Sequence, residues 1–256
     1  MIWIVAALIV VGGTAVGWAA AHLVHRYSED PETETAVLGD ATCPHCDHAL
    51  ALADTAPPKW WFDGQPCPNC REPLPSSWIG VQLAVPVLGL AMLATFGLVW
   101  SLIPFLWLVP VLVVAAAVDI RTMLIPRRIV WVGFWVGLAL LTSTILITGT
   151  VEDLVRSLAG AALYFGILYI TYLISPAGMG FGDVRLALLL GLYLGRISLM
   201  LTAVGLFLAC IFGVVMGLAV RHATGGQKHF PFGPGLALGT MVAIFFWSPI
   251  TSGLSG

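Results

Sequence analysis

The stretch LIPFLWLVPVLVVAAAVDIRT, residues 102–122, decides how the chain folds, because seventeen apolar residues lead without interruption to an aspartate. A helix that crosses a bilayer needs about 20 predominantly apolar residues, and about 17 is the lower bound. Residues 102–118 meet that length, so we expect Asp119 at the edge of a membrane. Placing an ionisable side chain there is costly, and such a residue usually indicates a function.

The composition of the whole chain is that of a membrane protein. Of its 256 residues, 59% are hydrophobic and 9% are charged, whereas about 25% are charged in a typical soluble domain. Apolar runs separated by Pro and Gly signals predict an all-α polytopic membrane protein with about eight transmembrane helices. The runs cover residues 1–24, 78–98, 102–118, 129–148, 154–175, 184–194, 197–220 and 236–250. The formal net charge of −2 gives no reason to expect nucleic acid as a partner.

A polar segment interrupts this apolar pattern. Nine of the thirteen acidic residues lie between Glu29 and Glu72, and four of the five cysteines lie there too. We therefore divide the chain into a first transmembrane helix (1–24), a small polar insert (25–77) and a seven-helix membrane core (78–256).

The distribution of Lys and Arg predicts the orientation, because cytoplasmic loops retain basic residues. With the N-terminus outside, nine basic residues face the cytoplasm and two face outward. The nine are Arg26, Lys59, Arg71, Arg121, Arg127, Arg128, Arg185, Arg221 and Lys228, and the two are Arg156 and Arg196. The insert, Asp119 and Asp183 are then expected on the cytoplasmic side of a multi-pass protein.

The insert contains two CxxC pairs, CPHC at residues 43–46 and CPNC at residues 67–70. Two such pairs separated by twenty residues have the spacing of a zinc ribbon, in which four thiolates surround the ion as a tetrahedron. The alternative is a pair of disulfides, which a cytoplasmic position disfavours because thiols stay reduced there. We therefore predict a structural zinc site with the ligands Cys43, Cys46, Cys67 and Cys70.

Two carboxylates outside the insert are candidates for function. Asp119 ends one apolar run, and Asp183 begins another in the segment GMGFGD at residues 178–183. Each has an ordinary alternative, since Asp183 could cap a helix and Asp119 could pair with Arg121 or Arg128. Taken together, on one side of the membrane and beside glycines that permit close approach, they could hydrolyse a peptide bond as base and acid.

The segment GFGD at residues 180–183 resembles the GxGD motif of the intramembrane aspartyl proteases, and its surroundings resemble that motif in the type IV prepilin peptidases. Three further segments are similar to the same family, in the same order. They are the double CxxC, DIRTMLIP at residues 119–126 and PFGPGLALG at residues 231–239. The presenilin-like proteases also carry GxGD, but the zinc ribbon favours the prepilin peptidases.

The resemblance implies a membrane endopeptidase that removes the short basic leader of type IV prepilin or pseudopilin precursors at the cytoplasmic face of the bacterial inner (cytoplasmic) membrane. It implies that Asp119 and Asp183 are the catalytic residues and that Gly180 and Gly182 shape the substrate site. Many bacterial members of the family also methylate the new N-terminus with S-adenosylmethionine.

Four positions depart from the family's pattern, and one of them, Arg185 in place of Lys after the GxGD aspartate, preserves the charge. Arg127 stands where members often have a second aspartate, which leaves Asp119 as the only candidate in the first motif. Ala21 and Gln82 stand where Asn and Glu are common, in the part of the family associated with methyl transfer. The sequence therefore leaves open whether methylation is retained, which pilin is the substrate and what the oligomeric state is.

A different class of protein also fits part of the pattern. In a non-enzymatic transporter or assembly subunit with a zinc-ribbon insert, the aspartates would conduct ions or cap helices. Internal repeats and charges near the midplane would favour a transporter, and the sequence offers neither.

Within the enzyme hypothesis, helix dipoles predict that Asp183, at a helix N-terminus, is the ionised base and that Asp119 is the protonated acid.

Overall fold

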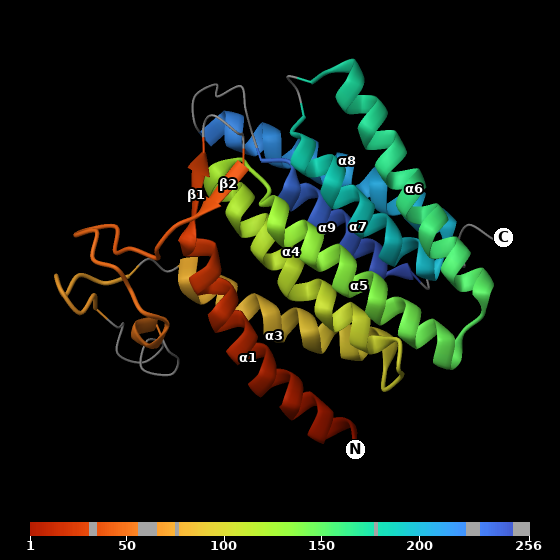
Figure 1. Cartoon of the computed structure of the whole chain (residues 1–256), viewed down its shortest axis with the longest axis horizontal. Coiled ribbons are helices and arrows are strands. Elements are labelled where there is room, and N and C mark those ends of the chain that lie inside the picture. The colour runs from red at the N-terminus through yellow and green to blue at the C-terminus, as the bar shows by residue number, and fades with distance from the viewer. Residues whose placement is uncertain (31–34, 56–65, 75–76, 177–178, 224–230, 248–256) are drawn as a thin grey trace.

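The computed structural model describes residues 1–30, 35–55, 66–74, 77–176, 179–223 and 231–247. These ranges contain eight α-helices arranged side by side, with a small insert between the first two (Figure 1). The helices are α1 (Ile2–Arg26), α3 (Ser77–Phe96), α4 (Leu102–Thr122), α5 (Arg127–Thr148), α6 (Val151–Ile174), α7 (Phe181–Ile197), α8 (Leu199–Ala223) and α9 (Gly233–Phe245).

Each predicted apolar run corresponds to one of these helices, so the helical fold class is confirmed. Six of the helices, all except α7 and α9, have the length and composition needed to cross a membrane. The expectation of eight spans is therefore confirmed only in part. The end of the last predicted run, residues 248–250, lies outside the described residues, as do Lys59 and Lys228.

The short helix α7 is the centre of the bundle. Its 17 residues rise about 26 Å, less than the roughly 30 Å of a bilayer core. Its leucines other than Leu188 are fully buried, because α5, α6, α8 and α9 pack around it (Figure 1). A helix that is covered by protein does not have to match the thickness of the lipid, which explains why α7 can be short.

The helices alternate in direction, so each end of the bundle gathers particular side chains. At one end, Asp153 in the first turn of α6 is paired with Arg156 and, at 3.3 Å, with Arg196 in the last turn of α7. At the other end, the last turn of α4 meets the first residue of α9 through the hydrogen bond from Gly233 to Asp119. The two predicted aspartates lie at this second end.

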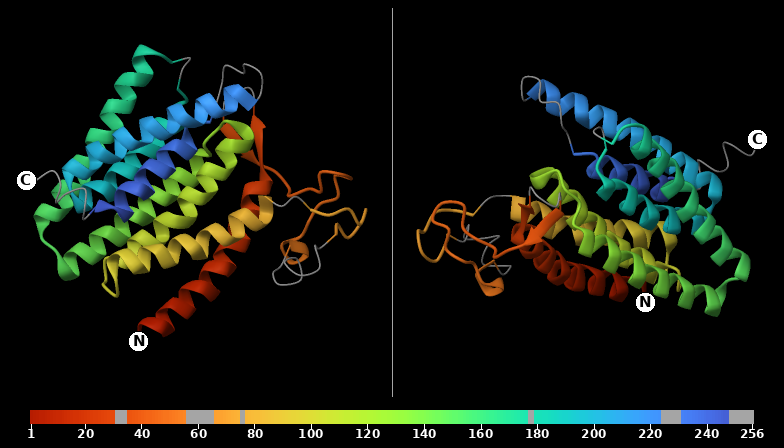
Figure 2. Two further views of the ribbon diagram at one scale, coloured as in Figure 1. Left: turned by 180° about the vertical axis from the view of Figure 1, so that it is seen from behind. Right: turned by 45° about the horizontal axis from the view of Figure 1, so that its top comes forward.

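The insert projects from the end of α1 and α3 (Figure 2). It begins with β1 (Tyr27–Asp30), which continues directly from α1 and pairs antiparallel with β2 (Thr35–Leu38), so that Tyr27 lies opposite Leu38. A one-turn 3₁₀ helix, η1 (Leu52–Thr55), follows. Two cysteines pack with Ala41, Leu50 and Leu74 against Ala21 of α1 and Trp78 of α3. The insert thus shares a small apolar core with the membrane helices.

Glycine allows α6 and α7 to approach closely. A Cβ atom added to Gly160 of α6 would lie 2.5 Å from the carbonyl oxygen of Gly191 and 2.6 Å from the Cα of Gly195, both in α7. These contacts are with backbone atoms, which cannot move aside as a flexible side chain can. Small residues at such positions are typical of helix packing in membranes.

We predict that Gly160→Ala destabilises the bundle by about 1–3 kcal/mol, because the added methyl group forces the two helices apart. Gly166→Ala is the matched control, since a Cβ at Gly166 on the same helix meets nothing within 4 Å. Thermal unfolding of the purified protein in detergent measures both variants. Equal melting temperatures for the two variants would contradict this account of α6–α7 packing.

Candidate active site and metal centre

Asp119 is a buried carboxylate, with 3% of its surface exposed. It lies in the last turn of α4, which ends at Met123. Met123 has a left-handed backbone (φ 55°) and donates its N–H to the Asp119 carbonyl oxygen at 2.8 Å. This ending stops the helix one turn after Asp119 and directs the chain toward α5.

The backbone of Gly233 supplies the hydrogen-bond partner of this carboxylate. Its N–H, at the first residue of α9, donates to Oδ2 of Asp119 at 2.8 Å. A Cβ on Gly233 would lie 2.7 Å from that same oxygen, so only glycine permits the approach. Because the free N–H groups at a helix N-terminus favour negative charge, α9 is oriented to stabilise an ionised Asp119.

Asp183 is also buried, with 6% of its surface exposed, and is the third residue of α7. The N-cap of α7 is Gly180, and no side-chain hydrogen bond caps the helix. Gly180, and not Asp183, is therefore the cap residue. The Oδ1 atom of Asp183 is buried and has no hydrogen-bond partner among the described residues, so it is available to a water molecule or a substrate.

The two aspartates belong to one site. The Asp119 carboxyl group is close enough to act electrostatically on Asp183, and Ile125 lies between the segments that carry them. A Cβ on Gly182 would be 2.9 Å from the Ile125 Cβ, and a Cβ on Gly233 would be 3.1 Å from the Ile125 Cδ1. The last turn of α4, the turn after it and the starts of α7 and α9 therefore meet around two carboxyl groups.

The cations considered for Asp119 have other partners or positions. Arg121 contacts Nδ1 of His25 at 2.9 Å and the carbonyl oxygen of Val24 at 3.4 Å. Arg128 lines a separate groove beside Tyr27. Within the described part of the chain, Asp119 forms no ion pair, so the interpretation of Asp119 as a structural salt bridge is wrong.

The four predicted cysteine ligands meet in the insert. Their sulfur atoms all lie within 4.8 Å of one another, and Cys43–Cys70 and Cys46–Cys67 are each 3.7 Å apart. A tetrahedron with metal–sulfur bonds of about 2.3 Å has edges of about 3.8 Å, so the group could hold a metal ion. All four are free thiols, and the fifth cysteine, Cys210, lies outside the group.

The two CxxC pairs have the same backbone geometry. Cys43 accepts the N–H of Asp47 on its carbonyl oxygen, and Cys67 accepts the N–H of Arg71, both at 2.9 Å. Asp47 and Arg71 are both left-handed, with φ of 54° and 61°. Each pair is thus a tight turn that points two sulfur atoms in one direction, as a four-thiolate site requires.

The two positions associated with methyl transfer lie where the insert contacts α1 and α3. Ala21 and Gln82 are fully buried, and the Gln82 side chain donates to the carbonyl oxygen of Thr55 in η1 at 3.4 Å. Trp18 donates to the Thr55 hydroxyl at 3.1 Å. Neither position is open to a cofactor.

Sequence reasoning did not identify two residues of the site, Gly233 and Ile125. Both lie in segments that carry the family resemblance, residues 231–239 and 119–126. The family resemblance therefore marked both segments. It did not show that the backbone N–H of Gly233 reaches the carboxylate of Asp119.

A helical membrane bundle with two buried aspartates at the ends of neighbouring helices is the arrangement expected of an intramembrane aspartyl protease. Residues 106–218, which include both aspartates, match the type IV leader peptidase family. The resemblance that the motifs indicated is thereby confirmed, and the transporter alternative is not favoured.

Several curated relatives match most of this chain. A prepilin leader peptidase/N-methyltransferase of Aeromonas hydrophila is 29% identical over 82% of this chain and 72% of its own. A protein of the same name from Burkholderia pseudomallei is 28% identical over 84% of this chain and 70% of its own. A third, from Bacillus subtilis, is 27% identical over 83% of this chain and 84% of its own. No solved structure gives a significant match.

Proposed function

We propose that this chain is a membrane aspartyl endopeptidase that cleaves the leader peptide of type IV prepilin or pseudopilin precursors. The observation that carries the proposal is the pair of buried carboxyl groups, Asp119 and Asp183, at the meeting point of α4, α7 and α9. The names of the relatives support the choice of substrate.

In the proposed reaction, the two carboxyl groups share one water molecule and one proton. The ionised carboxylate takes a proton from water, which adds to the scissile carbonyl carbon, while the protonated carboxyl group donates to the carbonyl oxygen. The tetrahedral intermediate then collapses. The carbon–nitrogen bond breaks as the proton taken from water passes to the leaving amine. One hydroxyl proton of the intermediate returns to the carboxylate that had donated to the carbonyl oxygen, which restores the starting state of the pair.

We assign the ionised role to Asp119 and the protonated role to Asp183. The N–H of Gly233 supports a negative charge on Asp119, whereas Oδ1 of Asp183 is buried without a donor among the described residues. This order is the reverse of the one predicted from the dipoles of α4 and α7 alone. The difference arises because the N-terminus of α9, which that argument did not include, lies against Asp119.

The glycines of GFGD have different proposed roles. Gly180 is exposed, and a Cβ there would make only ordinary contacts, 3.6 Å from Oδ2 of Asp183 and 3.9 Å from the Gly182 nitrogen. It leaves the approach to Asp183 open for an extended peptide. Gly182 instead allows the start of α7 to pack on Ile125. We therefore propose Gly180 as a substrate contact and Gly182 as a positioning residue.

We propose a multi-pass protein of the bacterial inner membrane with its N-terminus outside. The asymmetry of Lys and Arg supports this orientation, since the ion pairs of Arg156 and Arg196 with Asp153 lie at the end of the bundle away from the aspartates. The insert and the proposed catalytic site would then face the cytoplasm, where a precursor with a basic leader is found before export.

The aspartate assignment predicts unequal losses on substitution. Asp119→Asn should lower the cleavage rate of a prepilin-type precursor about 10²–10⁴-fold, because an amide cannot act as a base. Asp183→Asn should retain more activity, since its amide still donates a hydrogen bond to the substrate carbonyl. Cleavage by the purified protein in detergent, followed on gels, measures both rates.

Glu152→Gln is the matched control, because Glu152 is an exposed acid at the opposite end of the bundle. It should cleave at the wild-type rate. Greater residual activity in Asp119→Asn than in Asp183→Asn would reverse the assignment, and full activity in either would remove that residue from the mechanism.

The contact between Gly233 and Asp119 makes a second prediction. The methyl group of Gly233→Ala would overlap Oδ2 of Asp119, and displacing a catalytic group by about 1 Å can cost about 10²-fold in rate. We expect a loss in kcat of that order with little change in KM. Gly166→Ala, which adds the same methyl group in open space, should leave both constants unchanged, and an equal effect in the two variants would refute the contact's role.

We propose that the four cysteines hold one structural zinc ion, because four thiolates with tetrahedral spacing leave no coordination position open for water. The purified protein should contain one equivalent of zinc by elemental analysis. Cys67→Ser should lose the metal and expose the insert to proteolysis, while Cys210→Ser should retain both. A wild-type protein that holds no metal and has these cysteines in disulfides would contradict the proposed zinc site.

The proposal stops at peptide cleavage. The relatives' name includes a methyltransferase activity. Here, however, Ala21 is buried against the apolar cluster of the insert, and Gln82 is buried with its amide bonded to Thr55 of η1. These positions do not fit a binding site for S-adenosylmethionine, and we assign no residue of this chain to that cofactor.

A further inference from the structure

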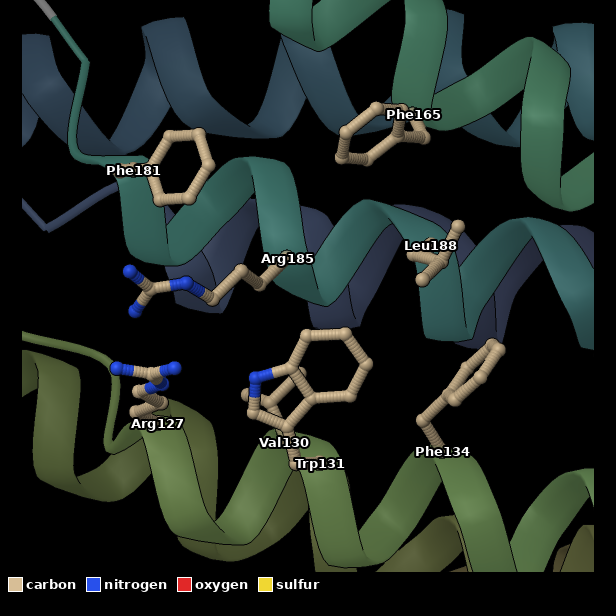
Figure 3. A pocket seen from close by; sticks show the side chains of 8 residues that line it. All are labelled: Arg127, Val130, Trp131, Phe134, Phe165, Phe181, Arg185 and Leu188. Carbon is tan, nitrogen blue, oxygen red and sulfur yellow. The ribbon is translucent and has the colours of Figure 1, made fainter.

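A cavity of about 320 Å³ lies between α5, α6 and α7, next to the aspartate site but separate from it. Figure 3 shows its two ends. The guanidinium groups of Arg127 and Arg185 lie together at one end, and Phe134, Phe165 and Leu188 lie at the other, with Trp131 between them. Arg127 begins α5 and Arg185 lies in the second turn of α7, so the charged end coincides with the end of the helices.

The two arginines form a like-charge pair, and no described carboxylate serves as their counterion. They are close enough for the charge of Arg127 to act on Arg185. In the part of the chain that the structure describes, neither is ion-paired with a carboxylate, and the ion pairs found there involve only Asp153. Arg185 stacks over the Phe181 ring, 4.6 Å from its centre, which fixes its direction. Two such cations repel each other unless an anion lies between them.

The rest of the cavity is suited to a hydrocarbon chain. Val130 and Phe134 are buried and form its floor, while Trp131, Phe165 and Leu188 are half-buried along its sides. Apolar walls that run along transmembrane helices from a charged end match the two parts of a phospholipid. Arginine also binds phosphate with two parallel hydrogen bonds, which makes it suited to a headgroup.

We propose that this cavity binds one anionic phospholipid, with its phosphate between Arg127 and Arg185 and part of an acyl chain against Trp131 and Phe134. Basic pockets between transmembrane helices are known to take anionic headgroups on the cytoplasmic side, where the proposed orientation puts this end of the bundle. A basic leader peptide is excluded as the occupant, because its charge has the same sign as the two arginines.

Lipid binding can be measured without substrate, so the test does not depend on the proposed peptidase activity. Native mass spectrometry of the purified protein, titrated with phosphatidylglycerol or phosphatidylcholine, counts bound lipids and gives an affinity for each. We expect one phosphatidylglycerol to bind at least about tenfold more tightly than phosphatidylcholine. Because a charge-assisted hydrogen bond contributes about 1.5–3 kcal/mol, Arg127→Gln should weaken phosphatidylglycerol binding about tenfold.

Arg128→Gln is the matched control, because it removes the same charge from the neighbouring residue, which lines a different groove. Its affinity for phosphatidylglycerol should stay within about twofold of wild type. Arg127→Lys keeps the positive charge but loses the two parallel N–H donors of the guanidinium. Its affinity for phosphatidylglycerol should lie between those of wild type and Arg127→Gln, which would show that the loss in Arg127→Gln is not caused by misfolding.

Four results would overturn the proposal. The first is an equal loss in Arg127→Gln and Arg128→Gln, and the second is no preference for phosphatidylglycerol. The third is displacement of the lipid by millimolar inorganic phosphate, which would make the cavity a small-anion site. Displacement by a prepilin-type precursor that carries an acidic residue, abolished in Arg127→Gln, would assign the arginines to the substrate and would overturn it as well.

Discussion

The hydrogen bond from the Gly233 N–H to Asp119 is the interaction on which the rest of the site depends. A carboxylate buried in a membrane bundle is stable only if a donor reaches it, and here the donor comes from a helix 114 residues further along the chain. The absence of a side chain on Gly233 allows that approach. The bond joins α4 to α9, and Ile125, in the turn that follows α4, carries the contact on to Gly182 and the start of α7.

Three features gather at this end of the bundle, and each solves a different physical problem. The insert has too few apolar residues for a core of its own, so four cysteines and Trp78 hold it against α1 and α3. The aspartates are enclosed by α4, α7 and α9. Arg127 and Arg185 lie at the charged end of the apolar cavity between α5, α6 and α7. The opposite end is closed by the ion pairs of Asp153.

The helices, the two CxxC pairs and both aspartates could be predicted from the sequence, because each depends on composition or spacing within a short segment. The N-terminal position of α9 against Asp119 could not, since it depends on how distant helices pack. For the same reason, the dipole argument leads to the opposite order of acid and base from the one we propose. Apolar runs also could not distinguish a helix that spans lipid from one, such as α7, that is enclosed by other helices.

The central claim is that Asp119 and Asp183 act as a unit in one site. The most direct measurement is the cleavage rate of the Asp119→Asn/Asp183→Asn double variant beside the two single variants. Residues that act together show losses that are far from additive in free energy. The double variant should therefore retain the residual rate of the more damaged single variant. A double variant whose loss equals the product of the two single losses would show independent roles and would contradict the account.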